Sequence, residues 1–202
     1  MDPNANKKGL KNKLSKKQAL EKLNSESFFR KTVSFYRYVM IDNPEQFRDD
    51  LYDEFSRLNC LGRIYIAREG INAQMSVPEH NWSLFTEGLE KIDHLKYIPL
   101  KIAVEDDGKS FFKLTMKVRK QIVADGLPLE QYDVTNVGTH LSAKEWNKAM
   151  EEGALVIDMR NHYESEIGHF ENAICPQSET FREELPEVRE LLKGKESKKV
   201  LL

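Results

Sequence analysis

The residues that could do chemistry gather behind one apolar segment near the end of the chain. Residues 154–157 form an apolar run, Ala-Leu-Val-Ile, which ends abruptly at Asp158 and is followed by Arg160 and His162. Such a run with a charged tip predicts a buried parallel strand whose carboxyl end meets solvent. In open α/β sheets that end is where ligands bind. We therefore expect Asp158, Arg160 and His162 at a ligand-binding edge, with His162 as a candidate general acid or base.

A plainer structural role is open for the same residues. Asp-x-Arg is a common ion pair, so Asp158 and Arg160 could simply finish the strand. We favour a role in which they support a neighbouring catalytic loop over direct participation in chemistry. His162 has no identifiable partner in the sequence, and His169 is expected to hydrogen-bond backbone atoms.

Neither cysteine is a good candidate nucleophile. Cys60 follows an expected helix and fits a small core residue, and Cys175 follows the Gly168-His169-Phe170 step. A reactive cysteine needs an electropositive, partly open setting, which the sequence does not indicate for either residue. Their spacing matches no zinc knuckle, so we expect no metal site. Two cysteines are too few for a disulfide framework, which favours a reducing, cytoplasmic setting.

A second group of candidates is cationic. Residues 111–123 alternate between apolar and polar side chains, and no acid occurs in residues 109–124. Strand periodicity places three cations on one side, and we call them the basic ladder: Lys113, Lys117 and Arg119. Lys120 adjoins this ladder, and Arg68 lies in an expected tight connection at residues 68–70.

The basic ladder has two interpretations. A solvated outer face is common on protein surfaces. A row of cations near exposed aromatic side chains also suits an RNA backbone, and the candidate aromatics are Tyr36, Tyr38 and Tyr65. The five cations that we expect to contact RNA are Lys113, Lys117, Arg119, Lys120 and Arg68.

The elements that position the basic ladder follow from periodicity. Strands are expected near residues 33–41, 62–67, 71–77 and 100–104, with helices opened by Pro44 and Pro78. The order is β-α-β-β-α-β, the ferredoxin-like arrangement, which predicts a four-stranded antiparallel sheet with two helices on one face. The other face is then free to bind something or to be covered by the basic strand.

The chain divides into four expected segments. Residues 1–31 form a lysine-rich arm, which is either a solvated tail or frayed helix, or an arm that contacts phosphates. Residues 32–124 form the ferredoxin-like domain with its extra basic strand. Residues 125–138 form a linker, and residues 139–202 form a second, α/β domain.

Composition excludes several classes of protein. Of the 202 residues, 40% are hydrophobic and 32% are charged, so the chain can build ordinary cores and is not disordered overall. The formal net charge of -2 argues against a wholesale polyanion binder but allows a local basic face. We expect no membrane association, because no apolar run approaches the roughly 20 residues of a membrane span.

Several sequence blocks carry a family resemblance. Residues 156–160, 163–164 and 168–173 resemble the first signature of rhodanese domains. The chain from about Thr32 more closely resembles the bacterial rhodanese-domain tRNA wobble-uridine hydroxylases. The matching blocks occur in order at residues 67–73, 107–111, 116–119, 122–126, 136–138, 158–164, 168–173 and 180–183.

The resemblance implies a fold and an activity. It implies an N-terminal acylphosphatase-like domain of the ferredoxin type, followed by the first part of a rhodanese α/β domain. It also implies oxygen-dependent hydroxylation of the anticodon wobble uridine of tRNA to 5-hydroxyuridine, with molecular oxygen as co-substrate and no resident cofactor. The family's nucleophilic cysteine would follow Leu202, so we expect a longer protein and an inactive fragment. The oligomeric state stays open.

Two other functions remain open. The protein could be a rhodanese-type sulfurtransferase that carries a persulfide on the same expected cysteine. It could also be a catalytically inactive rhodanese binding module that has lost that cysteine.

Overall fold

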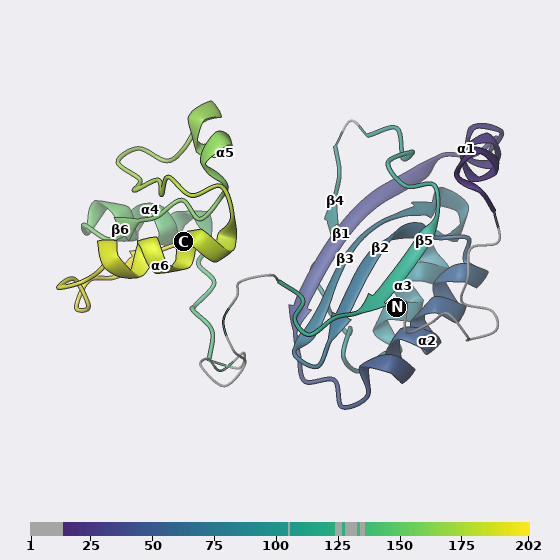
Figure 1. Cartoon of the computed structure of the whole chain (residues 1–202), viewed down its shortest axis with the longest axis horizontal. Helices are drawn as coiled ribbons and strands as arrows, with labels where there is room; N and C mark the ends of the chain where they lie inside the picture. Colours follow the sequence, from purple (N-terminus) through teal and green to yellow (C-terminus); the bar gives the residue numbers. More distant parts are fainter. Residues whose placement is uncertain (1–13, 105, 124–126, 128–132, 134–135) are drawn as a thin grey trace. The chain divides into compact units, whose positions relative to one another are not determined.

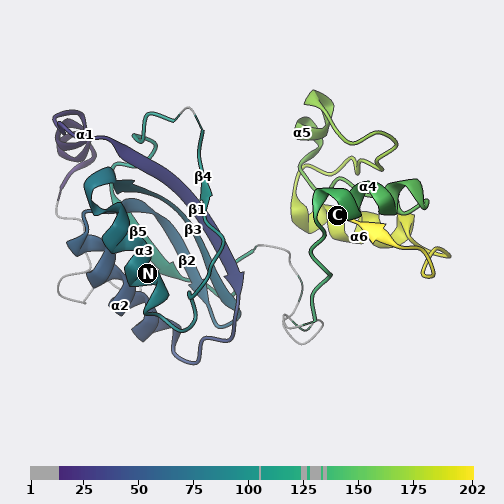
Figure 2. The same cartoon turned by 180° about the vertical axis from the view of Figure 1, so that it is seen from behind.

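The computed structural model describes residues 14–104, 106–123, 127, 133 and 136–202 (Figures 1 and 2). The chain forms two compact units, residues 1–123 and residues 124–202, and each is described by itself. Most of the expected linker, residues 125–138, lies outside the described residues. None of the described helices is long and apolar enough to cross a membrane.

The first unit is built on a five-stranded sheet in the order β4-β1-β3-β2-β5. Its strands are β1 (Arg30–Tyr38), β2 (Leu61–Ala67), β3 (Gly70–Pro78), β4 (Lys101–Ile102) and β5 (Leu114–Val118). The pairs among β1 to β4 are antiparallel, whereas β5 adds parallel to β2. The first four strands therefore confirm the predicted ferredoxin-like order, and the basic strand extends the sheet.

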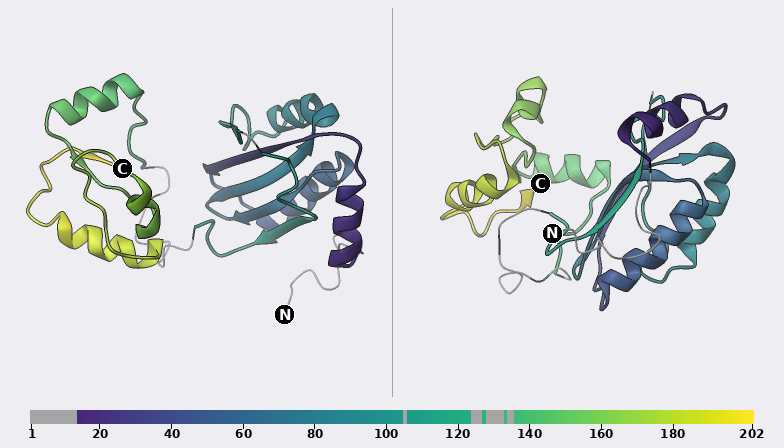
Figure 3. Two further views of the ribbon diagram at one scale, coloured as in Figure 1. Left: turned by 90° about the horizontal axis from the view of Figure 1, so that it is seen from above. Right: turned by 45° about the vertical axis from the view of Figure 1, so that its right-hand side comes forward.

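Two helices cover one face of this sheet (Figure 3). They are α2 (Pro44–Arg57) and α3 (Trp82–Glu90), and a short 3₁₀ turn, η1 (Glu79–Asn81), precedes α3. Helix α2 begins where expected, because the Asn43 side chain accepts from the backbone N–H of Gln46 and proline occupies the first turn. Phe55 and Phe85 face the sheet and are buried, which closes the core on this side.

Residues 16–24 of the lysine-rich arm form a capped and partly buried helix, which corrects the expected solvated tail or frayed helix for these residues. These residues form helix α1 (Lys16–Asn24), which opens with a complete capping box between Ser15 and Gln18. Ala19 and Leu23 are buried, so α1 packs on the unit through one apolar side. Strand β1 then begins at Arg30, two residues before the expected boundary at Thr32. Residues 1–13 lie outside the described residues.

The two edge strands are shorter than expected. The predicted fourth strand at residues 100–104 is reduced to Lys101–Ile102, and Ile102 and Val104 are exposed rather than in the core. Strand β4 pairs with β1 through only two residue pairs, so its side chains lie at the sheet margin. The basic strand is regular only over Leu114–Val118 of the expected residues 111–123.

The second unit has an α/β arrangement around a short parallel pair of strands. Its elements are α4 (Ala143–Glu151), β6 (Leu155–Val156), α5 (His162–Ile167), α6 (Phe181–Leu191) and β7 (Val200–Leu201). Strands β6 and β7 pair in parallel, and Val156 and Leu201 are buried with Ala149 of α4. The apolar run at residues 154–157 thus contains a parallel strand, as predicted, but the strand is only two residues long, and only Val156 and Ile157 of the run are buried.

Candidate functional site

The face of the first sheet opposite α2 and α3 presents aligned polar rows. In one row Tyr36 pairs with Asn72, Asn72 pairs with Tyr65, and Tyr65 pairs with Lys117, across four strands. The next row runs through Ser34, Gln74, Arg63 and Thr115, with Lys101 opposite Ser34 on the edge strand. We call these two rows the open sheet face. Side chains here alternate with buried residues that point toward the helices, as a pleated sheet requires.

Cations lie over the tyrosines of the open sheet face. The Arg119 guanidinium carbon is 5.3 Å from the ring centroid of Tyr65, and Lys101 Nζ is 5.8 Å from that of Tyr36. Tyr36 keeps 52% of its surface exposed. Each tyrosine therefore offers a π-face next to a positive charge, which is the combination that holds a base and its phosphate.

No carboxylate neutralises this face from within the sheet. None of the five strands contains Asp or Glu. Outside the strands, Asp106 accepts from the Thr32 hydroxyl at 2.8 Å at one end of β1. The open sheet face is thus a positive surface on a protein whose formal net charge is -2.

The core holds the basic ladder in position. Leu114 and Met116 are buried, so the alternate positions of β5, Thr115 and Lys117, point to the open side. Beyond the strand, the buried carboxylate of Glu69 accepts from the backbone N–H of Ile122 at 2.8 Å. The side chain of Glu69, which lies in the turn between β2 and β3, therefore holds the segment around Ile122 that follows the basic ladder.

The five cations predicted from the sequence are not all equivalent. Lys117 pairs with Tyr65 and Arg119 lies over the Tyr65 ring, so both belong to the open sheet face, whereas Lys113 precedes β5 and its Nζ lies 5.8 Å from the ring centroid of Phe112. Lys120 is exposed just beyond this strand, and Arg68 is exposed in the turn between β2 and β3, so both flank the face. Sequence reasoning missed Arg63 and Lys101, because isolated cations in separate strands show no pattern until the register is known.

The second candidate site is the carboxyl edge of β6. Arg160 donates to the Asp158 carboxylate through Nε at 2.8 Å, and its backbone N–H donates to the same carboxylate at 3.2 Å. Its Nη2 also donates to the carbonyl of Gly168 at 2.6 Å. Asp158 is buried, whereas Arg160 is half exposed. The pair therefore ties the strand end to the loop after α5, which is a structural arrangement.

The two histidines of this unit behave differently. His169 Nδ1 lies 2.8 Å from the carbonyl of Ser165, which agrees with the expected backbone contact. His162 opens α5, and its Nε2 is 3.5 Å from Glu166. Its Nδ1 is buried and has no hydrogen-bond partner within the described part of the chain. The structure does not join His162 to the Asp158–Arg160 pair.

Glu184 of α6 is a residue that sequence reasoning did not single out. It is 2% exposed, and its Oε1 has no hydrogen-bond partner among the described residues. Burial raises the pKa of this carboxyl, and the nearby carboxylates of Asp158 and Glu187 raise it further. Glu184 lies in a helix rich in charged residues, so the sequence pattern does not indicate that its side chain is buried.

Asp158 should make the second unit sensitive to acid. Hydrogen bonding from Arg160 holds the pKa of the Asp158 carboxyl below its usual range. Stability from this pair is therefore present at neutral pH and is lost as pH falls from about 4 through the lower folded pKa. We expect Asp158→Asn to lower the free energy of unfolding of this unit at pH 7, with a difference from wild type that shrinks below pH about 4. Urea unfolding followed by Trp146 fluorescence in a Trp82→Phe background measures it, and a pH-independent difference would contradict it.

Glu184 should have the opposite effect. A carboxyl with a raised folded pKa destabilises the native state when ionised, and stability increases as pH falls through that pKa toward the ordinary value of about 4.3. We expect Glu184→Gln to stabilise the second unit at pH 7, with no gain left at pH 4. The same Trp146 measurement tests this, with exposed Glu183→Gln in the same helix as matched control. A destabilised Glu184→Gln protein at pH 7 would show that the carboxylate has a favourable partner.

The cysteines do not form an active site in the described residues. Cys60 is buried in the core of the first unit, and burial raises the pKa of its thiol to about 12. Cys175 is half buried, with its thiol 3.7 Å from the carbonyl of Ala173. No group of three or more His, Cys, Asp or Glu side chains in the described residues could hold a metal ion.

Comparisons with known proteins cover both units. Residues 30–122 match the family described as the UPF0176 acylphosphatase-like domain. A protein of Leptospira interrogans named tRNA uridine(34) hydroxylase is 57% identical over 197 residues, which cover 97% of this chain and 54% of the relative. Proteins of the same name from Escherichia coli and Photorhabdus laumondii are 48% and 46% identical, each over 96% of this chain and 56% and 55% of their own lengths.

The chain thus spans about half the length of the curated relatives it matches. The resemblance seen in the sequence blocks is confirmed along both units, and the acylphosphatase-like expectation is confirmed for the first. The chain is therefore similar over both units to proteins named tRNA uridine(34) hydroxylase, and its residues 30–122 match the UPF0176 acylphosphatase-like domain.

Proposed function

We propose that the full-length protein hydroxylates the wobble uridine of tRNA to 5-hydroxyuridine, with molecular oxygen as co-substrate and no resident cofactor. The observation that carries this proposal is the 57% identity, over 197 residues, to a relative named tRNA uridine(34) hydroxylase. A tRNA substrate also fits the cytoplasmic setting expected from the cysteine content.

The open sheet face is the RNA-binding surface in this proposal. Anticodon bases are unpaired, so they can stack on aromatic side chains and offer their edges to amides. Tyr36 and Tyr65 supply the stacking surfaces, and Asn72 between them supplies an amide. Lys117 opposite Tyr65 and Arg119 over the Tyr65 ring supply charges for the phosphates on the same side.

The second unit has a supporting role in this proposal, as the amino-terminal part of a rhodanese domain. Strands β6 and β7 are parallel neighbours, and Ile157 donates its N–H to the carbonyl of Leu201 at 2.9 Å. Residues that follow Leu202 in a longer protein would therefore emerge beside Asp158. A nucleophilic cysteine placed there would lie next to an edge that the Asp158–Arg160 pair already holds rigid.

The decisive experiment uses full-length protein, unmodified tRNA and ¹⁸O₂. We expect one labelled oxygen on the wobble uridine by mass spectrometry of the nucleosides, and no gain of mass without oxygen. A product whose added oxygen is unlabelled, and so comes from water, would contradict the proposal, as would the absence of any product.

The rhodanese-type alternative predicts a different product. A sulfurtransferase would convert thiosulfate and cyanide into thiocyanate and would leave the uridine mass unchanged. A catalytically inactive binding module would do neither but would still bind tRNA through the open sheet face. The two assays on one preparation therefore separate all three functions.

A further inference from the structure

The buried carboxyl group of Glu184 has no role in the proposed function. Glu184 lies in the first turn of α6, and its side chain is buried. Its Oε1 atom is inaccessible to solvent and has no hydrogen-bond partner among the residues that the structure describes. Buried polar atoms are nearly always paired in folded proteins, so this oxygen requires an explanation.

The path of the chain places the first turn of α6 at the carboxyl edge of β6. Ile174 bonds through its backbone to Val156 and Asp158, at 2.8 and 2.9 Å. Ile157 donates to Leu201 of β7, so β6 lies between Ile174 and β7. Helix α6 connects these two outer segments, so it runs back along the sheet and begins at the carboxyl edge. Its first turn therefore lies at the same edge as Asp158.

The charges at this edge do not balance. Arg160 donates to both carboxylate oxygens of Asp158, so that acid already has its cation. Glu187 accepts from the hydroxyl of Ser178 at 2.6 Å. Burial, and then the carboxylates of Asp158 and Glu187, raise the pKa of Glu184. Within the described ranges no cation pairs with Glu184, so the edge lacks one positive charge.

Strand β7 ends at this same edge. The register pairs Val156 with Leu201, so a residue that follows Leu202 would be level with Asp158. The region matched in the Leptospira interrogans relative makes up 54% of that protein. In the full-length protein of the proposed function, a segment that continues from β7 would therefore leave the sheet beside Glu184.

We propose, on the basis of the longer protein in the proposed function, that a cationic side chain of the segment after Leu202 pairs with the Glu184 carboxylate. An arginine or lysine supplies both things that the edge lacks, a donor to Oε1 and a positive charge next to two carboxylates. A neutral donor would satisfy the oxygen but would leave a buried charge uncompensated. Glu184 is thus a positioning residue, which holds this segment against the carboxyl edge of β6.

The first test compares one substitution in two chains of different length by hydrogen exchange and mass spectrometry. In the 202-residue chain at pH 7, Glu184→Gln removes an unpaired buried charge, so exchange of the β6 peptide should slow. In the full-length protein the same change leaves a buried cation without its partner. Exchange of the peptide that follows Leu202 should then accelerate at least about tenfold.

The matched control is Glu183→Gln, an exposed position in the same turn of α6. We expect it to change exchange of either peptide less than about twofold. Slower or unchanged exchange after Leu202 in full-length Glu184→Gln would overturn the proposal, and so would an equal acceleration by Glu183→Gln.

Double-mutant cycles identify the partner. Each arginine and lysine within about ten residues after Leu202, a length that can loop back to the edge, is replaced by glutamine alone and together with Glu184→Gln. The partner's replacement should accelerate exchange as Glu184→Gln does, and the double variant should exchange no faster than either single variant. Additive effects at every cation, or a segment without any cation, would overturn the proposal.

The pH dependence separates a charge pair from simple packing. A carboxylate holds a cation only when it is ionised, so the difference in protection between wild type and Glu184→Gln should vanish below pH about 4. The neighbouring groups Asp158, Arg160, Glu187 and His162 are present in both proteins, so the difference reports on Glu184. An equal difference at pH 7 and below pH about 4 would show that shape alone matters and overturn the pair. These measurements contain neither tRNA nor oxygen, so a protein without hydroxylase activity still gives a clear result.

Discussion

Reversing the basic ladder with Lys113→Glu, Lys117→Glu and Arg119→Glu should weaken tRNA binding by at least about 100-fold at low salt. Lys117 lies within β5 opposite Tyr65, Arg119 just after the strand lies 5.3 Å from the Tyr65 ring, and Lys113 directly precedes the strand. The change removes three phosphate partners and adds three repulsive charges to a sheet that contains no acid in its strands.

The salt dependence of binding is the sharper measurement. Each lost phosphate contact should flatten the plot of log affinity against log salt by about 0.7 to 0.9, so the slope should fall by about 2 to 3. The matched control reverses three exposed cations of the helix-covered side: Arg57, Lys91 and Lys96. If the two triple variants lose equal tRNA affinity, the effect is due to net charge alone. If the ladder variant keeps its affinity, the open sheet face does not bind tRNA.

Replacing Gly70 by alanine should destabilise the first unit by about 3 kcal/mol or more. Gly70 has φ of 151°, a conformation that side chains rarely adopt, and an added Cβ would lie 2.1 Å from the carbonyl oxygen of Arg37. Its other close neighbours, the Arg37 carbonyl carbon and Tyr38 Cα, also belong to the backbone of β1. A backbone cannot rotate away as a side chain can, so the β1–β3 pair must separate locally.

The same chemical change in α3 is the control for Gly70→Ala. At Gly88 an added Cβ meets only the flexible Glu54 carboxylate, at 3.4 Å, and alanine favours a helix over glycine by up to about 1 kcal/mol. We expect Gly88→Ala to be neutral or stabilising. Urea unfolding monitored by Trp82 in a Trp146→Phe background reports on the first unit alone. A loss below about 1 kcal/mol in Gly70→Ala would show that the strand end yields more easily than its geometry suggests.

Local patterns predicted the elements of the first unit well. Asn43 and Pro44 marked the start of α2, the alternation in β1 to β3 marked the strands, and their order identified the ferredoxin-like arrangement. These signals are local because caps and strand periods depend on residues only a few positions apart. The edge strands β4 and β5 were predicted too long. Each has a partner strand on one side only, so its backbone pairing ends before its alternating apolar pattern does.

The candidate site was predicted only in part. Within β5 the period of 2 sufficed to place Lys117 on the open side, and Arg119 lies over the same face just after the strand. Arg63 and Lys101 join the same face from strands that are far away in the sequence. Glu184 looked like an ordinary surface residue of an amphipathic helix, and only the packing of α6 revealed that its carboxylate is buried without a partner.

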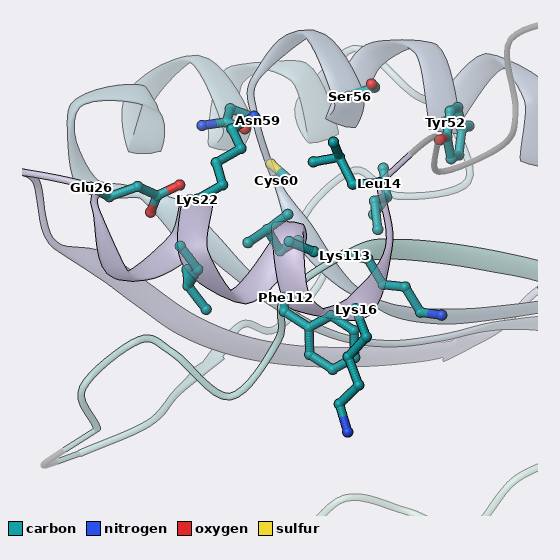
Figure 4. Close-up of a pocket in the computed structure, with 14 residues that line it drawn as sticks. Leu14, Lys16, Lys22, Glu26, Tyr52, Ser56, Asn59, Cys60, Phe112 and Lys113 are labelled. Atoms are coloured by element: carbon teal, nitrogen blue, oxygen red, sulfur yellow. The ribbon is translucent and has the colours of Figure 1, made fainter.

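The sequence by itself determined three features: the division into two units, the alternation of apolar and polar side chains along each main strand, and the family resemblance. Each of these depends on short-range periodicity or on blocks of contiguous residues. Only the tertiary structure decided which polar residues stand side by side. Strand register aligned Tyr36, Asn72, Tyr65 and Lys117 in one row. The docking of α1 likewise placed Leu23, Cys60 and Leu114, from three separate segments, around one cavity (Figure 4). Register and docking are settled by burial of the whole core, which no local stretch of sequence encodes.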